Sequence, residues 1–191
     1  LVAQAIVDRG EWVLPRRNGE LPSKPPLFHW LAASAAALFG WSDAVLRLPS
    51  AMAAWVAACC TFALGRAAGG RRTGWLAVGA LAGTVPFLDA AFVARVDMLC
   101  AACVTAALTA FFVWYRDGSR RARALVYLAA TAGVLAKGPV GAALPALVIV
   151  VFLAVEGNLG RLRELWSWPL AGLTVLVDGG WYALAALEGG R

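Results

Sequence analysis

Long apolar stretches separated by short polar segments run through most of this chain of 191 residues. The apolar stretches that follow the polar N-terminal part occupy 48–65, 75–94, 98–115, 124–136, 140–155 and 166–187. A helix needs about 20 apolar residues to cross the roughly 30 Å of hydrocarbon in a bilayer. The pattern therefore predicts about six membrane helices, of which 124–136 is short. No segment carries a strong strand pattern, so we expect an all-α fold.

The composition supports a membrane location for these stretches. Hydrophobic residues make up 61% of the chain, the mean hydropathy is +0.72, and soluble domains are nearer half apolar. Charges are bunched between the apolar runs, as expected when a charge at the bilayer centre costs roughly 2.5–3.5 kcal/mol. The chain is therefore predicted to be a polytopic membrane helix bundle.

The net charge of +6 comes almost wholly from arginine, and most arginines lie in three loops. The loops are 66–74, with Arg66, Arg71 and Arg72; 116–123, with Arg116, Arg120, Arg121 and Arg123; and 156–165, with Arg161 and Arg163. These loops alternate along the chain, so the positive-inside rule places all of them in the cytoplasm. Orientation explains the basic clusters better than nucleic-acid binding, and we expect no nucleic-acid partner.

The polar segment 1–24 and the short apolar segment 25–40 precede the first long span. If 25–40 crossed the membrane, 1–24 would be cytoplasmic. The short length of 25–40 and the Lys24-Pro25-Pro26 sequence at its start favour a helix at the outer interface. We therefore expect 1–47 to be an extracytoplasmic loop with juxtamembrane helices, followed by the bundle of 48–191. The chain starts with Leu1 inside a polar segment, so we expect a fragment truncated at both ends.

This topology gathers most of the remaining charges on the outer face. The candidates for a functional site are Lys24, His29, Arg47, Arg95, Asp97 and Lys137, with Asp89 and Asp178 in the outer halves of their spans. Ionisable groups at membrane depth are rare enough to count as functional candidates. For Asp89 and Asp178, helix packing is the favoured interpretation.

Each main candidate has a simpler structural alternative. Lys24 precedes two prolines, which suit a helix start, so it is either a plain helix entry or a cation for an anion at the helix N-terminus. Asp97 is either a helix cap or the carboxylate of a binding site. Lys137 lies in a turn with Gly138 and Pro139, and it either serves the turn or pairs with a phosphate. His29 is either an interfacial anchor beside Trp30 or a ligand or base. No nucleotide-binding glycine motif or hydrolase motif is present, which excludes soluble nucleotide chemistry.

Several of these residues form ordered motifs. They are Gly10-Glu11-Trp12-Val13, Pro15, Asn18-Gly19, Lys24-Pro25-Pro26-Leu27, Trp30, Leu38-Phe39-Gly40, Arg47-Leu48-Pro49-Ser50, Arg95-Val96-Asp97, Leu135-Ala136-Lys137-Gly138-Pro139 and Trp181-Tyr182. The set resembles the polyprenyl-phosphate-dependent glycosyltransferases of the GT-C fold. The branch it resembles most contains lipid A aminoarabinose transferases and protein O-mannosyltransferase-like enzymes.

The resemblance implies an integral enzyme of the bacterial inner membrane whose active site faces the periplasm. Such an enzyme moves a sugar from a polyprenyl-phosphate carrier to an extracytoplasmic acceptor, which is a lipid A-like glycolipid, a protein or a cell-envelope glycan. If the matching positions have the same roles as in the family, Lys24 and Lys137 bind the donor phosphate and Asp97 is the catalytic carboxylate of the second acidic motif. His29, Arg47 and Arg95 are secondary candidates. The alternatives are a flippase or transporter of lipid-linked sugars and a non-catalytic membrane assembly subunit.

The sequence departs from the family pattern at three places. The family's first acidic motif would precede residue 1, so we expect the fragment to be inactive alone. Ser23 stands where the family often has a glutamate that can serve a metal, and Gly180 replaces a proline before Trp181. The sequence therefore assigns no cofactor and leaves a divalent metal open.

Overall fold

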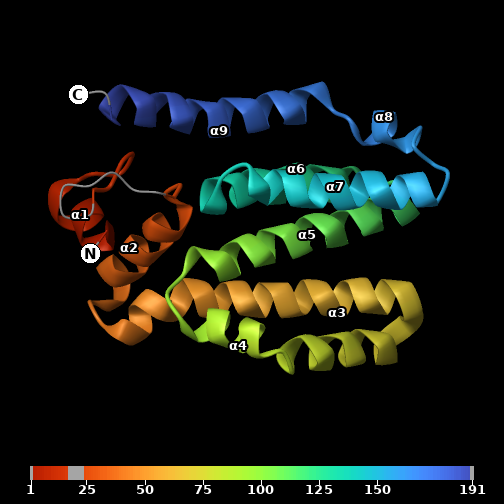
Figure 1. The fold of residues 1–191 in the computed structure, drawn as a ribbon, viewed down its shortest axis with the longest axis horizontal. Coiled ribbons are helices and arrows are strands. Elements are labelled where there is room, and N and C mark those ends of the chain that lie inside the picture. Colours follow the sequence, from red (N-terminus) through yellow and green to blue (C-terminus); the bar gives the residue numbers. More distant parts are fainter. Residues whose placement is uncertain (1, 17–23, 190–191) are drawn as a thin grey trace.

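The structure is a computed structural model that describes residues 2–16 and 24–189, and every regular element in this part of the chain is a helix (Figure 1). In order these are α1 (Val2–Arg9), α2 (Leu27–Phe39), α3 (Asp43–Ala82), α4 (Val85–Phe92), α5 (Val96–Asp117), α6 (Arg120–Lys137), α7 (Val140–Val155), α8 (Arg161–Leu165) and α9 (Trp168–Gly189). The predicted all-α fold is confirmed.

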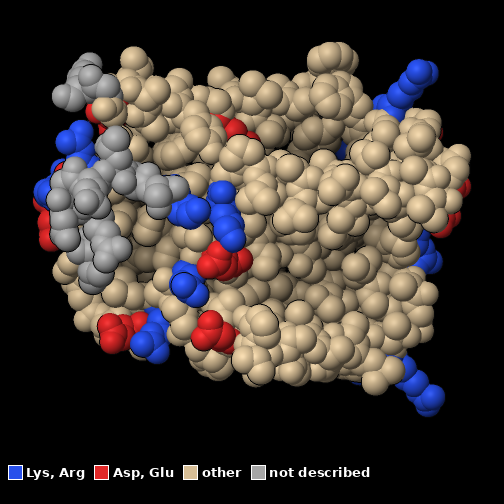
Figure 2. Space-filling model, in the orientation of Figure 1, with Lys and Arg blue, Asp and Glu red and all other residues tan. Residues whose placement is uncertain are grey.

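The long helices lie side by side, and their connections gather at two ends of a bundle (Figure 1). The kink in α3, the α5–α6 turn and α8 lie at one end. The short helices α1 and α2, the start of α5 and the α6–α7 turn lie toward the other. Charged side chains cluster toward these ends, and a broad uncharged surface covers the helices between them (Figure 2). This distribution fits a bundle whose middle contacts lipid.

The helix boundaries follow the hydrophobic pattern closely in the second half of the chain. α7 occupies 140–155, as predicted, while α5 and α6 extend a few residues beyond 98–115 and 124–136. α3 begins earlier than the predicted residue 48, because the Ser42 side chain accepts a hydrogen bond from the Val45 N–H and caps the helix there.

The prediction of one continuous helix over 75–94 is wrong. α3 ends at Ala82 and a new helix, α4, begins at Val85. The residue after Val85 is Pro86, which lacks a backbone N–H and therefore suits the first turn of a helix rather than its interior. α3 itself reverses direction at Gly69 and Gly70, inside the predicted loop 66–74; Gly70 has φ of +87°.

Among the described residues, α3, α5 and α9 are long and apolar enough to cross a membrane, and α2 and α7 are shorter apolar helices. Only 6% of the most apolar window of α9 is buried inside the structure. Side chains such as Val175 and Leu176, both 71% exposed, therefore need lipid or further protein around them. The fold is a polytopic membrane helix bundle, while the total of about six spans stays a prediction.

α1 is a helix that the polar N-terminal sequence did not reveal. It packs Ala3 and Ile6 against Phe28, Ala32 and Ala33 of α2. Phe28 is 4% exposed, and full burial of such a side chain is worth about 1.5–3 kcal/mol. This small cluster attaches the N-terminal segment to α2, which carries Lys24 at its entrance.

Candidate functional site

Two of the predicted site residues form an ion pair between helix ends. The Lys137 ammonium lies 2.6 Å from a carboxylate oxygen of Asp97. Lys137 is the last residue of α6, and Asp97 is in the first turn of α5. Each position suits its charge, because a helix C-terminus favours a cation and an N-terminus favours an anion. The helix ends therefore place the two side chains opposite each other.

Two further cations lie close enough to Asp97 to act on its charge. They are Arg95, two residues before it, and Lys24, which enters from the N-terminal segment. The structure thus brings together Lys24, Arg95, Asp97 and Lys137, which are far apart in the sequence. Three cations around one carboxylate leave an excess of positive charge, which is a favourable environment for a phosphate.

The Asp97–Lys137 pair is accessible from outside the protein. The side chains keep 44% and 36% of their exposure, respectively. The hydrogen bond to Asp97 raises the pKa of Lys137, so this lysine is charged at neutral pH. An ammonium has three N–H donors, so Lys137 can bind a phosphate oxygen while it stays on Asp97.

The start of α5 is fixed by a residue of α3. Ser50 is fully buried; its hydroxyl donates to the Arg95 carbonyl and its oxygen accepts the Arg95 N–H, both at 3.3 Å. Arg95 is the N-cap residue of α5, so this contact sets where the helix begins. Ser50 belongs to the Arg47-Leu48-Pro49-Ser50 motif, but the sequence alone did not assign it this role.

Lys137 is held by an unusually close turn between α6 and α7. Gly138 has φ of +86°, a conformation that side chains rarely adopt, and its N–H donates to the Val134 carbonyl at 2.7 Å. One turn further from the connection, Gly133 and Gly141 cross with their backbones in contact. A Cβ atom on Gly141 would lie 2.1 Å from the Gly133 carbonyl carbon. Glycine at both positions therefore allows the tight hairpin that ends in Lys137.

Lys24 stands on an ordered entrance to α2. The side chain of Lys24 is exposed, whereas Pro25 and Pro26 are buried, and Pro26 is the N-cap residue of the helix. Proline has a fixed φ, so the backbone directly after Lys24 is stiff. Ser23, the position where a metal-binding glutamate would be expected, lies outside the described residues.

Tryptophans of the predicted motifs secure the segment before this entrance. The Trp30 indole donates to the Trp12 carbonyl at 2.6 Å, and the Trp181 indole donates to the Val13 carbonyl at 3.0 Å. Trp30 is in α2 and Trp181 is in α9, so helices from both ends of the sequence hold one loop. These motif residues have a structural role that spacing did not reveal.

His29 and Arg47 are not part of the ion cluster. The His29 ring packs edge-on against Phe28 with centroids 5.8 Å apart, and burial lowers its pKa, so it is neutral at pH 7. This fits the interfacial-anchor alternative. Arg47 is exposed on α3 and its side chain makes no ion pair or hydrogen bond with the described residues.

Asp178 is the one predicted candidate that is buried in a long apolar helix. It lies in α9 at 8% exposure, and one of its carboxylate oxygens has no hydrogen-bond partner in the described part of the chain. Asp178 forms no ion pair with a side chain in that part of the chain. No group of three or more His, Cys, Asp or Glu side chains among the described residues is arranged to hold a metal ion.

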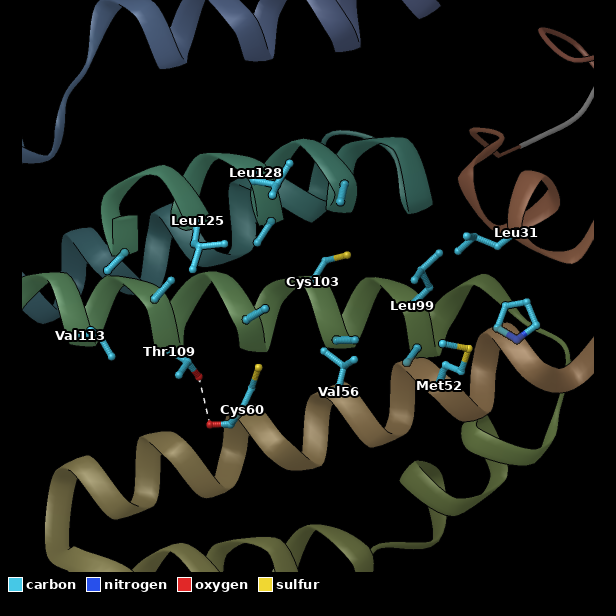
Figure 3. Close-up of a pocket in the computed structure, with 18 of the residues that line it drawn as sticks. Leu31, Met52, Val56, Cys60, Leu99, Cys103, Thr109, Val113, Leu125 and Leu128 are labelled. Carbon is cyan, nitrogen blue, oxygen red and sulfur yellow. Dashed lines mark hydrogen bonds between the residues drawn. The ribbon is translucent and has the colours of Figure 1, made fainter. Parts of the chain in front are cut away.

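A long apolar groove begins beside the ion cluster. It encloses about 800 Å³ between α2, α3, α5 and α6 (Figure 3). Along α5 its lining runs from Leu99, two residues after Asp97, to Val113, which at 1.5 Å per residue is about 21 Å. The Thr109 hydroxyl in its wall donates to the Cys60 carbonyl at 3.1 Å and is thus satisfied. The groove can therefore hold a hydrocarbon chain with its polar end near Asp97.

Residues 23–178 match the family model described as dolichyl-phosphate-mannose-protein mannosyltransferase. The chain belongs to this family. The match spans Lys24, Asp97 and Lys137 together with the helices that position them. Because the family is one of transferases, it favours this class over the transporter and assembly-subunit alternatives.

Two relatives resemble the chain over nearly its whole length. One is an undecaprenyl phosphate-alpha-4-amino-4-deoxy-L-arabinose arabinosyl transferase from Shewanella sediminis, 28% identical over 94% of this chain and 34% of the relative. The other is an uncharacterized protein from Aquifex aeolicus, 29% identical over 95% of this chain and 36% of the relative. The chain thus spans about a third of the length of these relatives.

The fold is that of ArnT from Cupriavidus metallidurans. The apo ArnT crystal structure superposes with a TM-score of 0.90 at 24% identity, covering 98% of this chain and 36% of ArnT. The structure of ArnT bound to undecaprenyl phosphate gives a TM-score of 0.91 at 23% identity, covering 100% of this chain and 36% of ArnT. The predicted GT-C type of helix bundle is confirmed by this likeness.

Proposed function

We propose that this chain forms the donor site of a membrane glycosyltransferase that takes a sugar from a polyprenyl-phosphate carrier. The observation that carries the proposal is the cluster of Lys24, Arg95 and Lys137 around Asp97 at the mouth of an apolar groove. A polyprenyl phosphate has the same two parts, an anionic head and a long hydrocarbon tail. The relative named for an undecaprenyl phosphate sugar supports this donor class.

In the proposed reaction, an acceptor oxygen attacks the anomeric carbon of the sugar. The bond from that carbon to the phosphate oxygen breaks, and the polyprenyl phosphate leaves with an additional negative charge. Cations already held in place stabilise this charge as it develops. Lys24 and Lys137 take this role, and the acceptor proton leaves to a base.

Asp97 contributes in two ways to this proposal. It fixes the Lys137 ammonium at 2.6 Å, which sets the direction of the cation before the donor arrives. It is also the carboxylate nearest to the proposed phosphate position, which makes it the candidate catalytic residue for the acceptor or the sugar. Arg95 supports the ionised form of Asp97 as a neighbouring cation.

The tail of the carrier is proposed to lie in the groove lined by Leu31, Leu99 and Val113. This places the sugar outside the hydrocarbon at the membrane surface. With the arginine loops in the cytoplasm, the site faces the periplasm of a bacterial inner membrane. The family description names mannose and protein, whereas one relative is named for an aminoarabinose donor. The proposal therefore covers the carrier class and a lipid, protein or glycan acceptor.

The test is sugar transfer by the protein as the cell produces it, with a radiolabelled polyprenyl-phosphate sugar as donor. We expect Lys24→Ala to abolish transfer to the acceptor fraction. Arg163→Gln, which removes a positive charge at the other end of the bundle, serves as the control and should keep transfer. Transfer at the unaltered rate in Lys24→Ala would refute the assignment of the phosphate site.

A further inference from the structure

The arginines at the predicted cytoplasmic end differ in whether their guanidinium groups form hydrogen bonds or ion pairs within the protein. Arg116 donates to the Ala67 carbonyl, and Arg123 donates to the Glu164 carbonyl. Arg161 lies 3.3 Å from a carboxylate oxygen of Glu164, and its guanidinium stacks over aromatic rings. By contrast, Arg121 is exposed and makes no ion pair or hydrogen bond with the described residues.

Arg121 nevertheless stands at a defined place, because it lines apolar cavities on two sides of α6. One is the groove already described, and the other is a groove of about 690 Å³ between α6 and α9. The walls of this α6–α9 groove are mainly leucine, alanine and valine: Leu125, Leu128, Ala132, Leu170, Leu173 and Val177. The guanidinium of Arg121, unpaired among the described residues, therefore lies at the edge of the apolar α6–α9 groove.

The hydroxyl groups in the α6–α9 groove are already bonded within the protein. Thr131 and Thr174 are hydrogen-bonded to each other across the two helices at 3.1 Å. The Tyr127 hydroxyl donates to the Leu165 carbonyl at 3.2 Å and accepts the Ser167 N–H at 3.1 Å. These groups have no need of a polar ligand, so the groove favours an apolar chain.

The proposed sugar donor does not account for Arg121. Arg121 is in the first turn of α6 and Lys137 is its last residue, so at 1.5 Å per residue they lie about 24 Å apart. A phosphate held at Lys24 and Lys137 is therefore at the opposite end of the helix from Arg121. An anion on Arg121 has to come from the other leaflet of the bilayer, whose hydrocarbon depth is about 15 Å.

We infer that Arg121 and the α6–α9 groove form a binding site for an anionic glycerophospholipid of the cytoplasmic leaflet. The lipid phosphate binds the Arg121 guanidinium, and one acyl chain lies between α6 and α9. A cation with no acidic partner complements an anionic headgroup, and Arg120 beside it is exposed and adds a second positive charge. The α6–α9 groove supplies an apolar surface for the acyl chain, so the protein recognises both the headgroup and the tail of the lipid. This site does not depend on transferase activity.

The test measures lipid selectivity with the complete protein reconstituted in phosphatidylcholine bilayers. Phosphatidylglycerol and phosphatidylcholine, each spin-labelled on an acyl chain, report their relative association with the protein by electron paramagnetic resonance. We expect a roughly fivefold preference for phosphatidylglycerol, the size of effect that one basic residue gives near anionic lipid. Arg121→Gln should remove it. Leu173→Trp, which fills the groove and keeps the charge, should also reduce it.

Arg71→Gln is the matched control, because Arg71 is an exposed arginine at the same end of the bundle that lines neither groove. This variant should keep the preference. The inference is overturned if phosphatidylglycerol shows no preference, as when other parts of the protein cover the groove. It is also overturned if the preference survives in Arg121→Gln, or if Arg71→Gln removes it equally, which indicates diffuse attraction by the whole basic end.

Discussion

Removal of the Asp97–Lys137 ion pair should change the free energy of unfolding little and the rate of sugar transfer strongly. Both side chains are more than a third exposed, and an exposed pair contributes only about 0–1 kcal/mol to folding. A catalytic or phosphate-binding role predicts a far larger effect on turnover. The two consequences of removing the pair can therefore be measured separately.

Asp97→Asn keeps the shape of the side chain and removes its charge. We expect sugar transfer to fall by about 10²- to 10⁴-fold, the usual contribution of a positioned acid or base, while the thermal unfolding temperature changes little. Transfer assays and a thermal melt of the purified protein check both parts. A variant that transfers sugar normally would show that the charge of Asp97 has no catalytic role.

Ser50 acts on the site from a distance, through the backbone of Arg95. Ser50→Ala removes the hydroxyl that bonds both the Arg95 N–H and its carbonyl, which should cost about 1 kcal/mol. It should also lower transfer between about 10- and 100-fold, because Asp97 is no longer held at a fixed helix start. Thr105→Val is the control, since it deletes a hydroxyl of α5 that bonds only within its own helix. Equal effects of the two substitutions would contradict a positioning role.

At the level of single residues, the sequence indicated the charged candidates more readily than the uncharged residues that hold them in place. Lys24, Asp97 and Lys137 were selected as candidates because charged residues beside apolar spans are conspicuous, and their functional role stays a prediction. Ser50 and the Gly133–Gly141 crossing were not assigned, because their effect depends on which helices pack together. His29 was left between two interpretations, and its aromatic contact and lowered pKa favour an anchor.

Among the helices, the α6–α7 hairpin is the element whose geometry most directly sets the site. Gly141→Ala would place a Cβ 2.1 Å from the Gly133 backbone, so the helices must move apart at a cost of about 1–3 kcal/mol. We expect a lower unfolding temperature and weaker sugar transfer, because Lys137 moves with the end of α6. Both are measured on purified protein.

Gly172→Ala in α9 is the matched control for this prediction, since nothing lies within 4 Å of its Cβ position. It should leave stability and transfer unchanged. If Gly141→Ala behaves in the same way, the close crossing does not position Lys137.

Helix existence followed from hydrophobic pattern, whereas helix breaks depended on local chemistry. The segment 140–155 matched α7, while the break before α4 came from a single proline within an apolar run. α1 was not predicted, because its few apolar residues give no clear helical pattern and are buried only by packing against Phe28 of α2. Likewise, the groove beside Asp97 is lined by the same residue types as any lipid-facing surface, so only the packed structure reveals it.

For the molecule as a whole, the proposed donor site requires that the two ends of the bundle face different sides of the membrane. The start of α5 and the α6–α7 turn lie toward one end of the bundle, and the kink in α3, the α5–α6 turn and α8 lie toward the other (Figure 1). The three arginine-rich loops, 66–74, 116–123 and 156–165, are at this second end. The positive-inside rule then predicts that the cluster is extracytoplasmic. The proposed donor site requires that Lys24 and Asp97 share that side.

Cysteine accessibility in intact cells tests this claim most directly. Single cysteines replace Lys24, Asp97 and Arg71 in a variant without the native cysteines, and a membrane-impermeant maleimide is added from outside. We predict that positions 24 and 97 are labelled in intact cells and that position 71 is labelled only after the membrane is permeabilised. Labelling of 24 and 97 from opposite sides of the membrane would contradict a shared site.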